Sequence, residues 1–320
     1  MTNTKLLILL FYLVFGAFRQ AMAHPGIGLV IDSKGNIYYT DLRQIWKQTP
    51  NGEKSVVVPN VHSHELYMDK HDNLFGEHYW YESAQNKFYH YQWCLKNTGE
   101  LIHLSENLVA NTPIPDFSFV RDDNGNMYWY EKAKTDTIHF IKRDTTGHKT
   151  KIASGLFKDI RWMFSTPNGE AYFLDLDDLY SITSDNKIEL VAKNLCTGTL
   201  WTIFAGKKHS VFGVWFDNAG NIYTAVTEDK CIKKINQNGE IAIVYKSENG
   251  SPINGLFDSS GSLWVLDNVG VKKVELTEIS KEQVWFSNNS KYLFGLTGLV
   301  AVLLIIRRLI RNNKKQLRQT

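Results

Sequence analysis

Short apolar runs alternate with polar turns along most of this chain, and one arrangement recurs six times. Each copy consists of an apolar run, a tight turn rich in Asp, Asn and Gly, and a second apolar run. Asp and Asn side chains bond their own backbone in turns, and Gly accepts positive φ, so the arrangement predicts a β-hairpin. The six copies are Gly28–Asp41, Leu66–His78, Phe119–Glu131, Met163–Asp175, Val214–Val226 and Gly255–Asp267.

One position at the start of each turn keeps the copies in step, and we call it the register position. A second turn follows in most copies, as at Thr49–Glu53 and Gln237–Glu240, and it predicts a third and a fourth strand. Six such units predict an all-β chain, a six-bladed β-propeller with four-stranded blades over residues 24–287. The register residues are Asp32, Asp69, Asp122, Thr166, Asp217 and Asp258.

These repeats resemble the NHL-type six-bladed propeller superfamily, which includes the gluconolactonase-like and TolB-like domains. The resemblance covers roughly residues 26–286 and implies a fold much more than a function. One segment departs from the common pattern. Gln283–Phe286 is predicted to give blade six its own outer strand, so closure of the ring would depend on packing between blades one and six.

The N-terminal residues 1–23 have the three parts of a signal peptide. Lys5 is followed by the apolar stretch Leu6–Phe18, and Ala21 and Ala23 provide the small residues of a cleavage site. The alternative is an uncleaved anchor, but the apolar stretch is shorter than the roughly 20 residues that span a bilayer. Cleavage would leave His24 as the new N-terminus.

The C-terminal region predicts a membrane anchor. Residues 292–306 carry no charge, and Arg307 and Arg308 can snorkel, which extends the apolar segment to Ile310. We therefore predict a linker at 288–291, a transmembrane helix at 292–310 and a basic cytoplasmic tail at 311–320. The alternative is a buried core helix, for which a propeller has no interior position.

Charge orients this predicted single-pass membrane protein. The residues after position 306 include six Lys or Arg and no acid, whereas residues 24–306 carry about −5 of the overall net charge of +3. The basic end is expected inside, with the propeller in the periplasm or outside the cell. An acidic propeller argues against nucleic acid. The expected partners are the membrane and a membrane-proximal protein, peptide or glycan.

Residues where the innermost strands begin should surround the mouth of the central channel. Counting four residues back from each register position gives a ring of Gly28, Glu65, Ser118, Trp162, Gly213 and Asn254. This placement depends on the register, since a slip of one residue turns every side chain to the other face. Asp116 and Arg161 could instead form a plain ion pair. The candidate binding residues are His64, Glu65, Asp116, Ser118, Arg161, Trp162 and Asn254.

Histidines near this ring suggest one divalent metal ion. His62 and His64 share a face of an extended strand, and together with His24 and Glu65 they could bind a metal such as copper. The alternative is a polar junction that happens to contain histidines. The resemblance to gluconolactonase-like propellers implies a metal held by an acid and several Asn or Asp. Glu65 and Asn254 match that pattern, whereas the ring's glycines and tryptophan do not.

Besides a metal-binding or metal-handling protein that uses the new N-terminal His24, two functions remain open from the sequence. The first is a membrane-tethered, non-catalytic module that binds a ligand or protein, and aromatic residues within 67–93 could serve a glycan or peptide or pack between blades. The alternative is a metal-dependent hydrolase or lactonase-like enzyme using His64, Glu65 and Asn254. The sequence contains no G-x-S-x-G, P-loop or H-E-x-x-H motif.

The three cysteines, Cys94, Cys196 and Cys231, allow one disulfide, and Cys196 and Cys231 are the pair closest in sequence.

Overall fold

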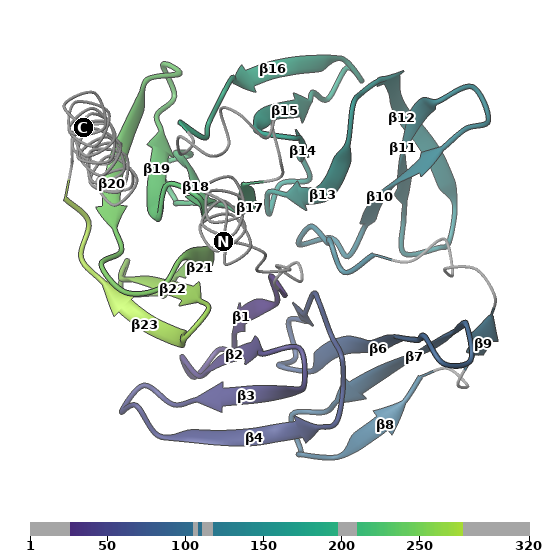
Figure 1. Cartoon of the computed structure of the whole chain (residues 1–320), viewed down its shortest axis with the longest axis vertical. Helices are drawn as coiled ribbons and strands as arrows, with labels where there is room; N and C mark the ends of the chain where they lie inside the picture. The colour runs from purple at the N-terminus through teal and green to yellow at the C-terminus, as the bar shows by residue number, and fades with distance from the viewer. Residues whose placement is uncertain (1–25, 105–107, 111–117, 198–209, 278–320) are drawn as a thin grey trace, which may run out of the picture.

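The chain folds into six antiparallel sheets arranged around a central axis (Figure 1). The computed structural model describes residues 26–104, 108–110, 118–197 and 210–277, and within them the regular elements are strands. The prediction of an all-β, six-bladed propeller is confirmed. The signal peptide, the linker, the transmembrane helix and the basic tail are all predicted in segments outside the described residues.

Three blades have the predicted four strands, connected in sequence order from the channel outward. Neighbouring strands pair antiparallel throughout. Blade one has β1 (Leu29–Ile31), β2 (Ile37–Thr40), β3 (Gln44–Gln48) and β4 (Lys54–Pro59); blade four has β13 (Ile160–Ser165), β14 (Ala171–Asp175), β15 (Asp178–Ile182) and β16 (Ile188–Ala192); blade five has β17 (Val211–Phe216), β18 (Ile222–Val226), β19 (Cys231–Ile235) and β20 (Ile241–Lys246).

The described parts of the other three blades depart from four strands. Blade two has five strands, because its central hairpin is long enough for β9 to pair with β7 beside β8. Blades three and six have three, and in blade three the innermost position is held by residues 118–121, joined by one bridge from Arg121 to Met127. The strands are β5 (Tyr67–Met68), β6 (Leu74–Glu82), β7 (Lys87–Leu95), β8 (Leu101–His103) and β9 (Leu108–Ala110); β10 (Met127–Lys132), β11 (Thr137–Arg143) and β12 (Lys149–Leu156); β21 (Pro252–Phe257), β22 (Leu263–Asp267) and β23 (Gly270–Val274).

The register position forms the same turn in every blade. In blade one the N–H of Asp32 donates to the carbonyl of Asn36, and the Asp32 carboxylate accepts the Asn36 N–H at 2.8 Å. The equivalent main-chain bond recurs at the other five register residues. In four blades an aromatic side chain six residues further on also donates to the register carboxylate: Tyr38, Tyr128, Tyr223 and Trp264.

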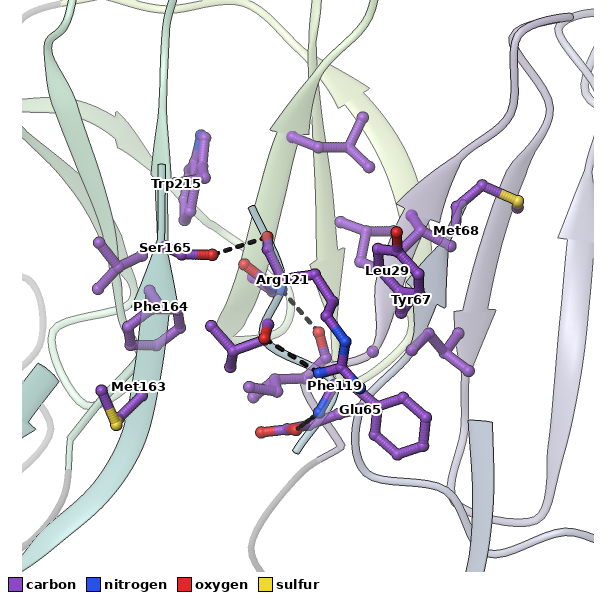
Figure 2. Close-up of a pocket in the computed structure, with 18 of the residues that line it drawn as sticks. Leu29, Glu65, Tyr67, Met68, Phe119, Arg121, Met163, Phe164, Ser165 and Trp215 are labelled. Atoms are coloured by element: carbon purple, nitrogen blue, oxygen red, sulfur yellow. Dashed lines mark hydrogen bonds between the residues drawn. The ribbon is translucent and has the colours of Figure 1, made fainter. Parts of the chain in front are cut away.

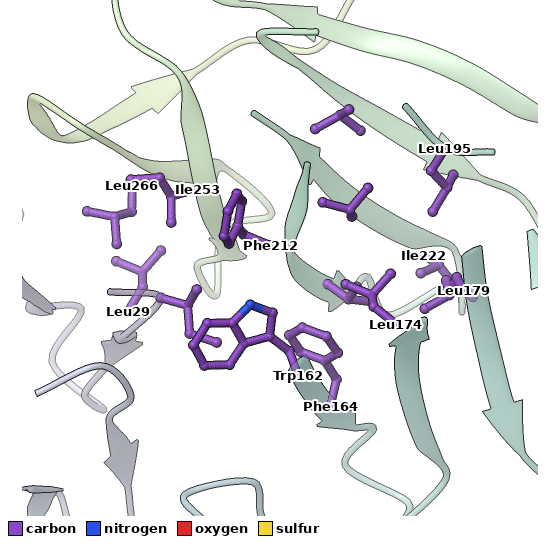
Figure 3. Packing of buried hydrophobic residues seen from close by; sticks show 14 of the residues in the cluster. Leu29, Trp162, Phe164, Leu174, Leu179, Leu195, Phe212, Ile222, Ile253 and Leu266 are labelled. Carbon is purple, nitrogen blue, oxygen red and sulfur yellow. The ribbon is translucent and has the colours of Figure 1, made fainter. Parts of the chain in front are cut away.

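The largest core cluster joins blades one, four, five and six, and Trp162 packs within it among Leu29, Phe164 and Phe212 (Figure 3). Beyond β23 the chain moves to blade five, where the N–H of Thr277 donates to the carbonyl of Val244 in β20 at 2.7 Å. The predicted outer strand of blade six, Gln283–Phe286, lies outside the described residues.

The cysteines are free thiols, so the disulfide considered between Cys196 and Cys231 is not formed. Cys231 is buried in the core, whereas the Cys196 thiol lies 3.6 Å from the Asp229 carboxylate. Burial raises the pKa of Cys231 to about 12, which keeps this thiol protonated and unreactive.

Among the described residues, no helix has the length and apolar character needed to cross a membrane.

Candidate functional site in the central channel

A cavity of about 470 Å³ lies in the central channel, lined by the innermost segments of all six blades. Its lining extends from the level of Gly28, Glu65 and Asn254 toward the first turns of the blades, near Ile31 and Pro167. Because each blade contributes one short segment, the wall is built from residues far apart in the sequence. The fold therefore brings six segments, one from each blade, together around one cavity.

Apolar and aromatic side chains form most of the cavity wall (Figure 2). Leu29 comes from blade one, Phe119 from blade three, Phe164 from blade four and Trp215 from blade five. Phe164 and Trp215 are buried in the packing between blades, so their positions are fixed by the core as well as by the strands. Such a wall suits an apolar ligand held by a few polar groups.

Arg121 is the basic residue of this cavity (Figure 2). Its Nη1 donates to the carbonyls of Ser118 and, at 3.1 Å, Val120, and its guanidinium lies 5.7 Å from the centre of the Tyr67 ring. The hydroxyl of Ser165 donates to the Arg121 carbonyl at 2.7 Å, which fixes the backbone beneath the side chain. Burial lowers the pKa of Arg121 to about 10, so the side chain stays charged at neutral pH.

Glu65 lies beside Arg121 at the inner end of the cavity. Its Oε2 accepts the N–H of Phe119 at 3.4 Å, which joins blade two to blade three. Burial, followed by the nearby Glu77 carboxylate, raises the pKa of Glu65 to about 7, against the opposing effects of the Phe119 N–H and Arg121. Much of the Glu65 population is therefore uncharged at neutral pH.

Asn254 also lines the cavity, but its amide is committed to the backbone. Its Nδ2 donates to the carbonyl of Ile27 at 2.6 Å, and its Oδ1 accepts the N–H of Gly255 at 2.8 Å. The side chain is thus held between blades six and one. Its geometry fits a structural role in closing the ring better than a role as a metal ligand.

No family model matches this chain, and no curated protein sequence matches it. Solved structures do. A gluconolactonase from Xanthomonas campestris superposes with a TM-score of 0.53 at 10% identity, covering 80% of this chain and 87% of that chain. An auxiliary nutrient binding protein from Bacteroides ovatus gives 0.52 at 10% identity, covering 80% and 70%. One from Bacteroides thetaiotaomicron gives 0.50 at 13% identity, covering 80% and 69%.

The chain shares its propeller fold with these structures. At these identities the similarity establishes the fold alone. The resemblance stated from the repeats is confirmed at that level.

The structure places only part of the predicted ring of this six-bladed propeller at the cavity. Glu65 and Asn254 line the cavity, whereas Trp162 packs in the core cluster and Ser118 contributes a carbonyl to Arg121. Asp116 lies outside the described residues. Arg161 is part of β13, and its side chain is not among those described.

Of the predicted metal ligands, His62 and His64 lie together, and Glu65 lies apart from them in the cavity wall. His62 bonds the carbonyl of Leu42 through Nδ1 at 2.7 Å, and the His62 and His64 rings meet edge to face at 4.7 Å, whereas Glu65 faces the cavity. Within the described residues, no group of three or more His, Cys, Asp and Glu side chains is placed to hold a metal ion. His24 lies outside those residues.

Sequence reasoning missed Arg121, although a signal for it existed. In five blades the residue directly before the register position lines the cavity: Ile31, Met68, Arg121, Ser165 and Phe216. Counting one residue back, in addition to four, would have found the basic group. Counting four residues back from each register position identified residues only at the inner end of the cavity.

Proposed function

We propose that this protein is a non-catalytic binding propeller whose central channel takes a small, largely apolar ligand. The observation that supports it most is the cavity itself, about 470 Å³ in volume and walled mainly by apolar and aromatic side chains from six blades. That volume is within the range of ligand pockets in proteins, about 300–1,000 Å³. The naming of two similar propellers as auxiliary nutrient binding proteins agrees with a binding role.

The proposal includes where the module works. The uncharged segment at 292–306 and the basic residues after it support a tether to the membrane, with a helix at 292–310. Residues 1–23 support export, so the propeller would face the periplasm or the cell exterior. A membrane-proximal ligand or protein is then the expected partner. Protease treatment of intact cells, or of spheroplasts if there is an outer membrane, tests this. A propeller that resists digestion until the cells are lysed would contradict it.

Calorimetric titration of the full chain with 2-naphthamide tests binding in the channel, because this probe is uncharged and small enough for the cavity. Micromolar to millimolar binding is expected. Leu256 is half-buried in the cavity wall, so Leu256→Trp should fill the space and weaken binding at least about tenfold. The control is Leu190→Trp, at an exposed position on β16. Binding that is absent, or equal in both variants, would contradict the proposal.

A metal-dependent hydrolase or lactonase-like enzyme is the second candidate, and Glu65 is the observation that favours it. A carboxyl group with a pKa of about 7 inside a cavity is suited to general acid–base catalysis. The other residues fit less well, because the amide of Asn254 is bonded to the backbone and the ring of His64 packs on His62. Lactone hydrolysis abolished by Glu65→Gln, with naphthamide binding retained, would favour the enzyme.

A further inference from the structure

The cavity carries a half-buried positive charge, that of Arg121, in a largely apolar wall. Taking a guanidinium out of water costs free energy unless an opposite charge or hydrogen bonds compensate it. Part of the compensation comes from the carbonyls of Ser118 and Val120 and from the face of Tyr67, which carry partial charges only. Glu65 is the carboxyl group whose charge acts on Arg121, and at neutral pH it is partly protonated.

Apolar and polar parts of the cavity are separated along its length. Arg121 and Glu65 lie together near Phe119, whereas Phe164 and Trp215 form the wall on the other side (Figure 2). A ligand that fills this space meets a cation at one end and carbon along its body. An amphipathic anion matches both parts, since charge-assisted hydrogen bonds to arginine are strong and fork-shaped for carboxylates.

We propose that the central cavity selects small amphipathic carboxylates, with the ligand's carboxylate on Arg121 and its apolar body against Phe164 and Trp215. This inference rests on the proposed binding function and names the ligand class. Binding of such a ligand requires no movement of the cavity wall.

Binding of an anion at this place is coupled to a proton on Glu65. A second acid, Glu77, already acts on Glu65, and Glu77 is bonded to His90 at 2.9 Å. Tyr67 and Arg143 are the other titratable groups that act on Arg121. A ligand carboxylate would add a third negative charge beside Glu65 and Glu77. Glu65 then takes up a proton, so affinity falls as pH rises, by about tenfold between pH 6 and pH 8.

Two probes of nearly the same shape test the ligand class: 2-naphthoate, which is an anion, and 2-naphthamide, which is neutral. With the full chain at pH 6, naphthoate is expected to bind about tenfold more tightly. Arg121→Gln should remove that preference, whereas Arg121→Lys should keep most of it. Arg43→Gln, at an exposed position in blade one, is the matched control. Thermal unfolding of each variant verifies that it is folded.

The outcomes separate the two proposals. Equal affinities for the two probes in the wild-type chain, or tighter binding of naphthamide, overturn the anion class while leaving the binding function intact. A preference for naphthoate that survives Arg121→Gln in the folded variant also overturns it. Failure of both probes to bind overturns the binding function itself. Affinity for naphthoate that does not change with pH, or that changes equally in Glu65→Gln, contradicts the coupling to Glu65.

Discussion

The side-chain amide of Asn254 donates a hydrogen bond of 2.6 Å to the carbonyl of Ile27, a residue 227 positions earlier in the chain. The bond joins the inner strand of blade six to the segment that leads into blade one. Apolar packing of Ile253 and Leu266 on the blade-one residues Leu29 and Tyr39 supports it. Within the described residues, ring closure thus depends on packing between the facing surfaces of blades six and one and on the half-buried amide of Asn254.

Removing this amide should loosen the ring. Asn254→Ala is expected to lower the free energy of unfolding by about 1–3 kcal/mol, because the Ile27 carbonyl and the Gly255 N–H both lose their side-chain partner. Urea unfolding followed by circular dichroism measures the change. Asn238→Ala, at an exposed turn position, serves as the control and should change little. Equal stabilities of the two variants would show that closure does not depend on Asn254.

A buried ion pair in blade five should be sensitive to removal of its cation. The ammonium of Lys233 lies 3.0 Å from the carboxylate of Asp229, and both side chains are almost fully enclosed. Lys233→Met leaves that carboxylate buried without its ammonium and is expected to cost about 3–5 kcal/mol. The double variant Asp229→Asn with Lys233→Met should lose less. A double variant as unstable as the single one would argue against electrostatic balance as the cause.

The raised pKa of Glu65 predicts how stability changes with pH. Burial makes the folded state hold the proton more tightly than the unfolded chain, whose carboxyl titrates near 4.5. Between about pH 4.5 and 7 the folded state therefore binds more protons, and stability falls as pH rises through this window. Glu65→Gln should remove the slope and stabilise the protein by about 3 kcal/mol at pH 8.

Unfolding free energies measured at pH 5 and pH 8 test this expectation. The increase in the free energy of unfolding caused by Glu65→Gln should be present at pH 8 and nearly absent at pH 5. Glu53→Gln, at an exposed turn of blade one, is the matched control. A gain of the same size at both pH values would mean that the substitution acts through packing and not through titration.

The fold could be predicted from local turn chemistry. Asp32 and its five counterparts each close the same hairpin with short-range bonds, so a single sequence contains all the information needed. The strand count per blade was less predictable, because it depends on pairing at outer edges. The pairing of β9 with β7 and the bond from Thr277 to Val244 arise from tertiary contacts, which no local pattern encodes.

The binding site was harder to derive than the fold. Glu65 and Asn254 were found because the register fixes which residues begin the inner strands. Whether a side chain faces the cavity, the core or a neighbouring blade depends on packing. Trp162 packs in the core cluster and is not among the residues that line the cavity. Arg121 was overlooked because only the position four residues before each register residue was considered, whereas the position directly before it also lines the cavity.

The central claim is that the channel holds a small ligand, and a crystal structure of the full chain with 6-bromo-2-naphthamide tests it most directly. Anomalous scattering from bromine marks the ligand position independently of the fitted model. The predicted result is one bromine peak inside the cavity, in contact with Phe164 and Trp215. Bromine found only on the outer surface of the blades, with the cavity free of the ligand at saturating concentration, would contradict the account.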